Sequence, residues 1–337
     1  MNKLALLILI SGCVLWGCKS HNQKSNQIAN KLPVIFDTDA NNELDDQHAL
    51  AYLFFNSNVF DIKGITVNAT RNGGNIDSHF DEAERVMKLC KVADKIPLLK
   101  GADKSFTEIE NDLSNSNFDG FEAVDFIIGE AKKHTNEKLV VIAVGKLTNL
   151  ALALKKEPAI AENIRLVWLG SNYPEPGEYN LDNDIASMNY VLKTNIDFEM
   201  VTVRYGKSSG TDAVRITKEE ALKNMPGVGP RITIPIVGRH GGKFHTFGDY
   251  SENLFQNCKF HGNPPSRALF DMAAVAIVKN PKWAESTIIS CPIMVDEKWV
   301  EQPENSRKIN IWENFDKESI MKDFNQTMKK NNISQPE

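Results

Sequence analysis

The sequence predicts a single α/β domain with a mainly parallel central sheet flanked by helices. From about Leu32 onward, short apolar runs of strand length alternate with longer segments whose apolar residues recur at helical spacing. This alternation is typical of β-α units, which place parallel strands side by side and cover both faces of the sheet. No internal repeat and no Gly- or Pro-rich break interrupts it, so one domain is expected over residues 32–330.

Seven apolar runs have the length and composition of strands. They are bounded by polar turns, and most are apolar throughout, as is typical of strands buried on both faces. The strands expected are Val34–Asp37, Ile62–Val67, Ile96–Leu99, Leu139–Val144, Ile164–Leu169, Met200–Arg204 and Thr287–Met294.

Helices are expected between these strands, where apolar residues share one helical face. The helices expected are 47–54, 80–90, 121–131, Thr148–Lys156, Asp184–Leu192 and Asp271–Val278. Thr217 and Glu220 have the spacing of a capping box that begins another helix. A last helix is expected over Trp312–Lys330, followed by a frayed tail over 331–337.

The composition favours a globular protein and argues against nucleic acid as a partner. Of the 337 residues, 42% are hydrophobic, which is enough for a substantial core. The formal net charge is −5 and there is no long basic run, so the charge needed to attract a phosphate backbone is missing.

Residues 1–18 resemble a lipoprotein-type signal peptide. Lys3 precedes the apolar run 4–10, which is too short to span a bilayer. A small residue stands directly before both Cys13 and Cys18, and the usual signal length weakly favours Cys18 as the lipidated residue. A plain secretory signal is the alternative.

Residues 19–31 are polar and predict a tether between the anchor and the domain. The expected location is therefore outside the cytoplasm, as a membrane-anchored bacterial lipoprotein of the periplasm or cell surface. The chain would contact the membrane only through its lipid anchor.

The most informative segment joins the first strand to the first helix. It contains Asp37, Asp39, Glu43, Asp45 and Asp46. Carboxylates this close together raise one another's pKa, and a hard cation with oxygen ligands offsets that repulsion. Ligands of parallel sheets bind beyond the carboxyl ends of the strands, where this segment lies. The preference of acidic side chains for helix N-termini accounts for only one or two of the five.

Two other interpretations of this segment are weaker. In an EF-hand loop beginning at Asp37, the sixth position is Asn42 rather than Gly and the twelfth is His48 rather than Glu. An aspartyl phosphatase presents Asp-x-Asp after a strand as nucleophile and Mg²⁺ partner, which gives Asp45 and Asp46 no role.

Several sequence blocks, in order, resemble the nucleoside N-ribohydrolases, the inosine-uridine preferring nucleoside hydrolase-like family. The acidic segment is similar to the family fingerprint Asp-x-Asp-Pro-Gly-x-Asp-Asp. The further blocks are residues 141–153, 167–172 with 178–180, 184–187, and 270–276 with 280–281. One such block is weak evidence, whereas several in the family's order support one another. The resemblance spans roughly residues 32–281 and implies a Rossmann-like parallel sheet.

The resemblance implies a Ca²⁺ ion at the strand ends. Asp39, Asp46 and Asp271 would bind it through their side chains and Thr148 through its backbone carbonyl, in the oxygen-rich shell that calcium prefers. Asp37 would support these ligands from behind.

The implied reaction is hydrolysis of the N-glycosidic bond of ribonucleosides or related ribosides. Asp45 would be the general base that takes a proton from the attacking water, and the transition state would resemble an oxocarbenium ion. Asn172, Glu178 and Asn180 would hold the ribose hydroxyls, and Phe270 would stack on the base.

Two departures from the family pattern concern the acidic loop and the leaving group. The connection between Asp39 and Asp45 is two residues longer than the fingerprint, which leaves the direction of Glu43 open. Phe270 replaces the histidine that often precedes the last aspartate, and phenylalanine donates no proton. Either another group activates the leaving base or the base needs little help. Three histidines are candidates for this role, although each is more readily explained as a surface or packing residue: His240, His245 and His261.

The favoured function is therefore a calcium-dependent N-ribosyl hydrolase that acts on a small nucleoside or riboside, with a homo-oligomer left open. The alternative is a noncatalytic or specialised glycan-binding lipoprotein that uses the same metal and diol pocket. Asp45 distinguishes the two functions, because a binding protein needs no general base.

Overall fold

The central element of the fold is an eight-stranded sheet. The computed structural model describes residues 31–42 and 44–330. The strand order is β11-β14-β6-β5-β4-β1-β2-β3, and every neighbouring pair is parallel except β11 and β14. The strands are β1 (Leu32–Thr38), β2 (Phe60–Val67), β3 (Leu98–Lys100), β4 (Leu139–Ala143), β5 (Ile164–Ser171), β6 (Asp197–Thr202), β11 (Glu285–Ser290) and β14 (Lys308–Glu313).

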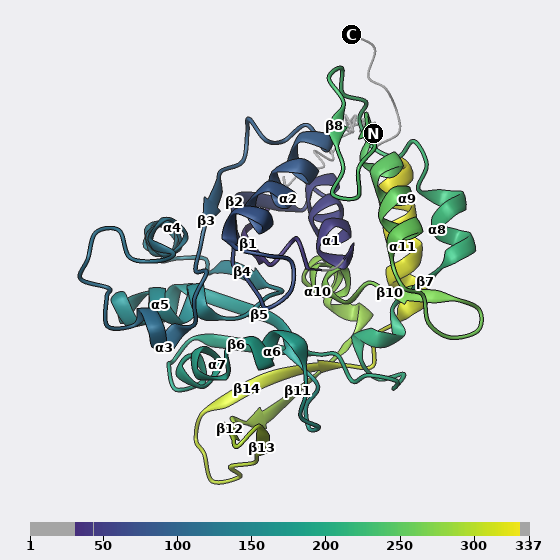
Figure 1. The fold of residues 1–337 in the computed structure, drawn as a ribbon. Helices are drawn as coiled ribbons and strands as arrows, with labels where there is room; N and C mark the ends of the chain where they lie inside the picture. The colour runs from purple at the N-terminus through teal and green to yellow at the C-terminus, as the bar shows by residue number, and fades with distance from the viewer. Residues whose placement is uncertain (1–30, 43, 331–337) are drawn as a thin grey trace, which may run out of the picture. The chain divides into compact units, whose positions relative to one another are not determined.

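Helices cover both faces of this sheet (Figure 1). One face carries α1 (Leu44–Phe55), α2 (Ile76–Leu89), α8 (Lys218–Asn224), α9 (Phe247–Asn257), α10 (Phe270–Lys279) and α11 (Lys317–Lys330). The other carries α3 (Phe106–Ile109), α4 (Phe121–Ala131), α5 (Thr148–Lys156) and α7 (Ile185–Leu192). The short helix α6 (Tyr179–Asn183) follows β5.

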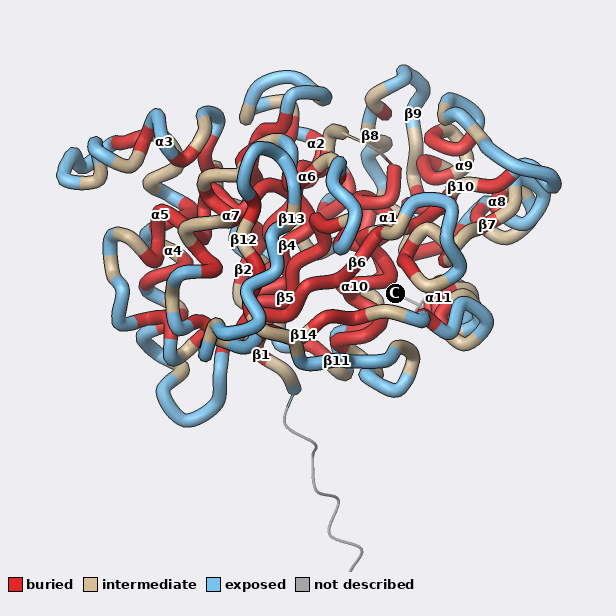
Figure 2. Tube along the Cα trace, turned by 90° about the horizontal axis from the view of Figure 1, so that it is seen from below, coloured by how far each residue is buried: buried red, intermediate tan, exposed pale blue. Residues whose placement is uncertain are grey.

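The strands β1, β4, β5, β6 and β14 contribute side chains to two separate hydrophobic cores. Val34 and Phe36 of β1 face the core beneath α1, whereas Ile35 between them faces the core beneath α5. Successive side chains point to opposite faces of a sheet, so a strand buried on both sides must be apolar at every position. Figure 2 shows the result, with buried central strands and exposed connecting loops.

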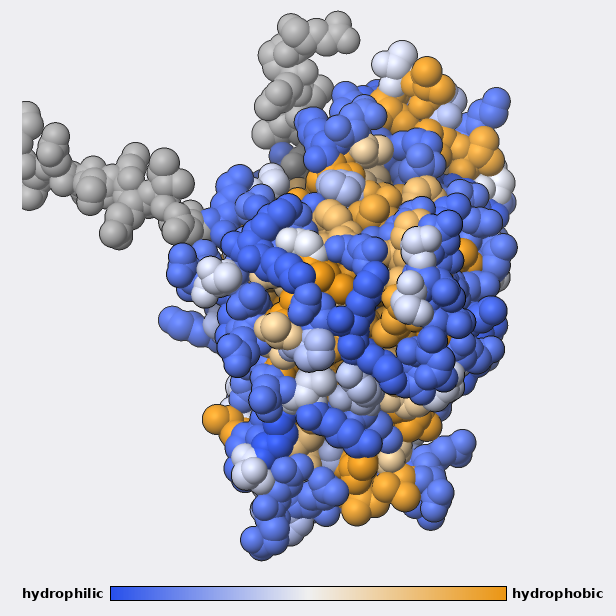
Figure 3. Space-filling view, turned by 90° about the vertical axis from the view of Figure 1, so that its left-hand side faces the viewer, coloured by the Kyte–Doolittle hydropathy of each residue, from blue (hydrophilic) through white to orange (hydrophobic). Residues whose placement is uncertain are grey.

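Small β-ribbons complete the described chain. They pair β7 (Arg215–Thr217) with β10 (Ser266–Ala268), β8 (Ile236–Val237) with β9 (Lys243–Phe244), and β12 (Ile293–Val295) with β13 (Lys298–Val300). Figure 3 shows a largely hydrophilic face interrupted by apolar patches, which is ordinary for a globular protein surface.

The structure confirms the predicted α/β class and its mainly parallel sheet, and the capping box at Thr217 and Glu220 is present. Two element predictions are wrong. The run expected as one strand over 287–294 is divided between β11 and β12. The helix expected to begin near Trp312 begins instead at Lys317.

Trp312 belongs to β14 because its surroundings favour a strand. Its indole Nε1 donates a hydrogen bond of 2.6 Å to Glu199 of β6, and only 6% of the residue is exposed. Ile309 and Ile311 of the same strand pack into the core beneath α5. These are contacts between distant segments, and they override the helical pattern of the local sequence.

The signal peptide expected over 1–18, most of the tether and the tail over 331–337 lie outside the described residues. Among the helices of 31–42 and 44–330, all are too short or too polar to cross a membrane.

Candidate active site

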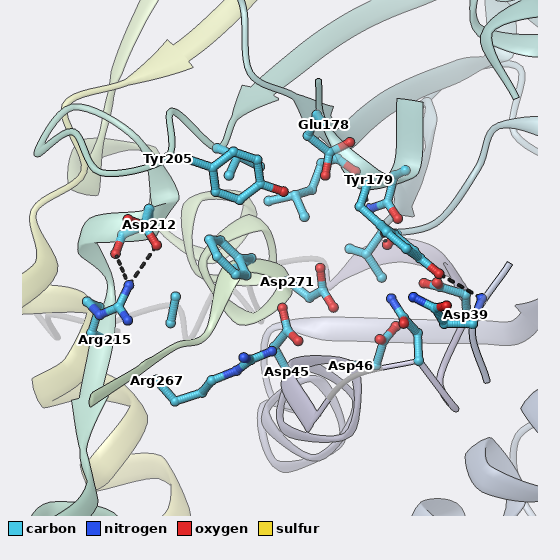
Figure 4. A pocket seen from close by; sticks show the side chains of 18 of the residues that line it. Asp39, Asp45, Asp46, Glu178, Tyr179, Tyr205, Asp212, Arg215, Arg267 and Asp271 are labelled. Atoms are coloured by element: carbon cyan, nitrogen blue, oxygen red, sulfur yellow. Dashed lines mark hydrogen bonds and ion pairs between the residues drawn. The ribbon is translucent and has the colours of Figure 1, made fainter. Parts of the chain in front are cut away.

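A cavity of about 420 Å³ lies beyond the carboxyl ends of β1, β4, β5 and β6 (Figure 4). This is the edge at which ligands of parallel sheets are expected. The residues that line it are Asp39, Asn42, Asp45, Asp46, Asn72, Val144, Leu169, Glu178, Tyr179, Asn180, Val203, Tyr205, Asp212, Arg215, His261, Arg267, Ala268, Phe270 and Asp271.

The acidic end of the cavity consists of Asp39, Asp45, Asp46 and Asp271. Asp39 directly follows β1, Asp45 and Asp46 lie in the first turn of α1, and Asp271 lies in the first turn of α10. Carboxylate oxygens of the last three lie within 4.8 Å of one another. Helices α1 and α10 pack together, so two helix N-termini direct their carboxylates at one point.

Burial is the main reason that these carboxyls hold protons unusually tightly. It raises the pKa of Asp39 to about 7, and that of Asp45 to about 7 with the Asp39 charge adding to the effect. The pKa values of Asp46 and Asp271 are raised well above the usual range, first by burial and then by the neighbouring carboxylates. A cation bound among them would relieve both the desolvation and the repulsion.

Hydroxyl groups fix two of these carboxylates from the protein side. Thr70 donates a hydrogen bond of 2.5 Å to Asp39, and Thr38 donates one of 2.5 Å to Asp46. Each acceptor retains an oxygen that can face the cavity. The acidic end is therefore held in place before any ligand binds.

Asp37 lies behind the cavity rather than in its wall. Its carboxylate is fully buried and accepts hydrogen bonds from Thr66 (2.7 Å), Asn68 (3.1 Å) and Asn149 (2.8 Å). Asn149 also accepts one from the Ala102 amide, so its side chain ties α5 to the neighbouring loops instead of capping its own helix. This position agrees with a supporting role for Asp37.

Glu178 and Asn180 reach the cavity from the start of α6. One oxygen of Glu178 accepts the Leu181 amide at 2.9 Å, and burial raises the pKa of this carboxyl to about 8. The Asn180 amide donates to the carbonyls of Val144 (2.8 Å) and Leu169 (3.0 Å), which leaves its own oxygen to accept. Together the two residues offer donors and acceptors suited to sugar hydroxyls.

Two predicted site residues are not brought to the cavity. Thr148 is the first residue of α5, so its carbonyl points along that helix, and its hydroxyl donates to Asp184 at 2.6 Å. Within this segment, the residue that lines the cavity is Val144, which directly follows β4. Asn172 instead spans two loops, accepting from the Tyr205 amide at 3.1 Å and donating to the Pro176 carbonyl at 3.0 Å.

The loop end of the cavity, which we define as Tyr205, Arg215, His261, Arg267 and Phe270, was largely missed by sequence reasoning. Only Phe270 was expected to contact substrate, and His261 was only one of three histidines considered. Figure 4 shows Arg267 extending toward Asp45, while Arg215 pairs with Asp212 at 2.6 Å. These residues come from four separate segments, and no local pattern marks them in the sequence.

The other two histidines considered lie elsewhere. His240 lines a separate cavity of about 180 Å³, and His245 contacts the Ile232 carbonyl at 2.9 Å.

Comparison with known proteins agrees with this fold. A model of the family described as inosine-uridine preferring nucleoside hydrolase matches residues 34–325. The non-specific ribonucleoside hydrolase RihC of Salmonella schwarzengrund is 25% identical over 298 residues, covering 80% of this chain and 85% of that protein. An uncharacterized protein of Schizosaccharomyces pombe is 31% identical over 112 residues, covering 31% of this chain and 36% of that protein.

Coverage of these relatives is uneven, since another RihC, from Klebsiella pneumoniae, is matched over 60% of its length. A solved structure described as the plant nucleoside hydrolase PpNRh1 superposes with a TM-score of 0.67 at 16% identity, covering 89% of this chain and 99% of that one. This likeness shows the fold. Because the family model covers most of the chain, the protein belongs to the inosine-uridine preferring nucleoside hydrolase family.

Proposed function

We propose that this protein hydrolyses the N-glycosidic bond of ribonucleosides or related ribosides and that it uses a calcium ion. The observation that carries the proposal is the acidic end. Three carboxylates from two helices lie within 4.8 Å of one another in a cavity that also contains Glu178 and Asn180. Family membership favours this enzyme over a protein that only binds glycans.

The residues of the acidic end suit a hard divalent cation. Their side chains offer only carboxylate oxygen, and the described cavity wall supplies no cysteine and only one histidine, at the loop end. Oxygen-rich sites with several carboxylates are typical of calcium and magnesium rather than of zinc or copper. Asp39, Asp46 and Asp271 would hold the ion, which when bound would lower the pKa of a water molecule and anchor a sugar diol.

Asp45 is the residue best suited to take the proton from the attacking water. It lies beside the proposed ligands, with a carboxylate oxygen within 4.8 Å of those of Asp46 and Asp271, so it can reach a water molecule held there. The positive charge that develops on the sugar would be stabilised by the surrounding carboxylates, including that of Glu178. Asn180 would orient the ribose through its remaining oxygen.

The direct test is a panel of uridine, inosine and 4-nitrophenyl riboside assayed with calcium and with a chelator. We expect ribose release that depends on calcium. Release of phosphate from 4-nitrophenyl phosphate with Mg²⁺, in the absence of ribose release, would instead support the phosphatase interpretation. Sugar binding without turnover would support the binding protein.

We further propose that the protein is an extracytoplasmic lipoprotein. The support is the apolar segment followed by Cys13 and Cys18. Expressed in a bacterium, the chain should acquire a lipid-sized mass increase and partition into detergent. Cys18→Ala should abolish both properties while Cys13→Ala retains them; the reverse result would assign the lipid to Cys13. The absence of any mass increase in the wild-type chain would exclude a lipid anchor.

A further inference from the structure

The loop end of the cavity must supply a hydrogen-bond donor to the leaving group. When a C1′–N bond breaks, its electron pair moves to the base, and a nitrogen anion is a poor leaving group unless a donor stabilises it. Phe270 provides no such donor. The inference below rests on the proposed hydrolysis of ribosides and asks which residue has this role.

Four donor side chains line the loop end, and three of them are less well suited. The guanidinium of Arg215 is engaged by Asp212 at 2.6 Å and by the Ser266 hydroxyl at 2.9 Å. Arg267 lies in the field of Asp271 and extends toward Asp45, on the side of the attacking water (Figure 4). His261 lies in an exposed loop at the rim of the cavity.

Tyr205 is the donor that the geometry directs into the cavity. Figure 4 shows its hydroxyl pointing toward the interior, on the side of Glu178. Its ring meets that of Phe270 edge to face, with centroids 6.0 Å apart and an interplanar angle of 82°. The ring of Tyr205 thus lies beside the residue that replaces the family's histidine. The Tyr205 residue is nevertheless 45% exposed, so a planar ligand can reach the ring.

The loop that carries Tyr205 is held in an unusual backbone conformation. Arg204 has a φ of +47° and Gly206 a φ of +71°, so left-handed residues flank Tyr205 on both sides. A non-glycine residue is rarely found in this region, because its Cβ comes too close to the following carbonyl oxygen. The conformation is secured by the bond from the Tyr205 amide to Asn172 and by a 2.9 Å bond from the Gly206 amide to Asp212. Such locally strained positions often occur at functional sites.

We propose that Tyr205 is a catalytic residue whose hydroxyl donates a hydrogen bond to the departing base, while Phe270 packs against the base. The water oxygen forms the new bond to C1′ and loses a proton to Asp45. The C1′–N bond breaks with its electron pair on the base, which is stabilised by the phenol and then protonated by solvent. Asp45 returns its proton to solvent, so the sum is addition of water across the C1′–N bond.

The electrostatic surroundings of Tyr205 support donation. Partial burial, followed by the nearby carboxylates of Glu178 and Asp45, raises the pKa of the phenol above its ordinary value. The hydroxyl therefore keeps its proton throughout the neutral pH range and is available to donate. The contribution of this hydroxyl to kcat should be larger for a poor leaving group than for one that is already stable as an anion.

The test compares Tyr205→Phe with the wild type on substrates of different leaving-group demand. Uridine and inosine release poor leaving groups, whereas 4-nitrophenyl riboside releases a phenolate that is stable at neutral pH. We expect kcat of the variant to fall about 100-fold on both nucleosides, as when one donor to a developing anion is removed, and less than threefold on the aryl riboside. The melting temperature should stay within a few degrees.

Two further variants make the result specific. Tyr190→Phe removes a phenol from α7, where the ring packs 4.9 Å from Phe106 and away from the cavity, and should leave every rate unchanged. His261→Ala should show no preference between substrates. An equal loss on all substrates for Tyr205→Phe, or a selective loss in His261→Ala instead, would overturn the assignment. Turnover of the aryl riboside by the wild type tests the hydrolase itself, so the two proposals can fail separately.

Discussion

The acidic end and the loop end of the cavity are built in opposite ways. At the acidic end, Asp45, Asp46 and Asp271 are buried at helix N-termini that pack against the sheet, and no more than 4% of any of them is exposed. At the loop end, Tyr205 and His261 are exposed and lie on irregular connections. The acidic end can therefore hold a fixed chemistry, whereas the loop end can change its leaving-group preference without disturbing the core.

The largest effect is expected from removing the base at the acidic end. Asp45→Asn keeps the size of the side chain but cannot accept a proton from water, so kcat should fall about 1,000-fold on nucleosides and on 4-nitrophenyl riboside alike. The variant should still bind calcium, as measured by the rise in melting temperature that calcium causes. If the variant turned over substrate at the wild-type rate, Asp45 would not be the base, and the acidic end would serve only to bind ligands.

Calcium and pH should act together on stability through the acidic end. The folded pKa values of Asp39 and Asp45 are raised to about 7, above those of the unfolded chain, so the folded state binds more protons between about pH 4 and pH 7. Without a cation, the free energy of unfolding should therefore fall as the pH rises through this window.

A calcium concentration that is one hundred times the Kd at pH 8 should add about 2.7 kcal/mol at that pH. The same concentration should add less at pH 5, because protons compete with the ion and raise its Kd. Melting curves with calcium and with chelator at both pH values measure this difference. The same calcium-induced shift at pH 5 and pH 8 would contradict a site made of these carboxylates.

A smaller effect is expected from restoring a donor at the loop end. Phe270→His places an imidazole at the start of α10, beside the proposed position of the base. In a Tyr205→Phe background we expect this change to recover about tenfold in kcat on inosine, with little change on 4-nitrophenyl riboside. Failure to recover activity, with the fold intact by circular dichroism, would mean that position 270 does not face the base.

The smallest effect distinguishes two roles for Asn172. If it holds the Tyr205 loop, as its 3.1 Å contact with the Tyr205 amide indicates, Asn172→Ala should lower kcat about threefold on uridine and leave the aryl riboside unchanged. If it holds ribose, KM should rise for both substrates. The KM of the aryl riboside decides between these roles, because it is unchanged in the first case and raised in the second.

The same comparison explains how much could be predicted from the sequence. Asp37, Asp39, Asp45 and Asp46 lie within ten residues between a strand and a helix, so local patterns were enough to recognise the acidic segment. The parallel sheet was predictable for a similar reason, because strands buried on both faces are apolar throughout.

The loop end was not predictable because its contacts join distant segments. Tyr205 meets Phe270 across the sheet edge, and neither the loop after β6 nor the start of α10 marks that meeting in its own sequence. Val144 lines the cavity where Thr148 was expected, and its apolar side chain gives no sign of this in the sequence. Trp312 was placed in a helix because its strand partners, β6 and β11, are far away in the chain.

The hydroxyl contacts beneath the acidic segment explain how this chain accommodates its longer connection. Thr70 holds Asp39 and Thr38 holds Asp46, so both ends of the connection between β1 and α1 are anchored independently of its length. Two additional residues between Asp39 and Asp45 can therefore fit without moving the two anchored carboxylates.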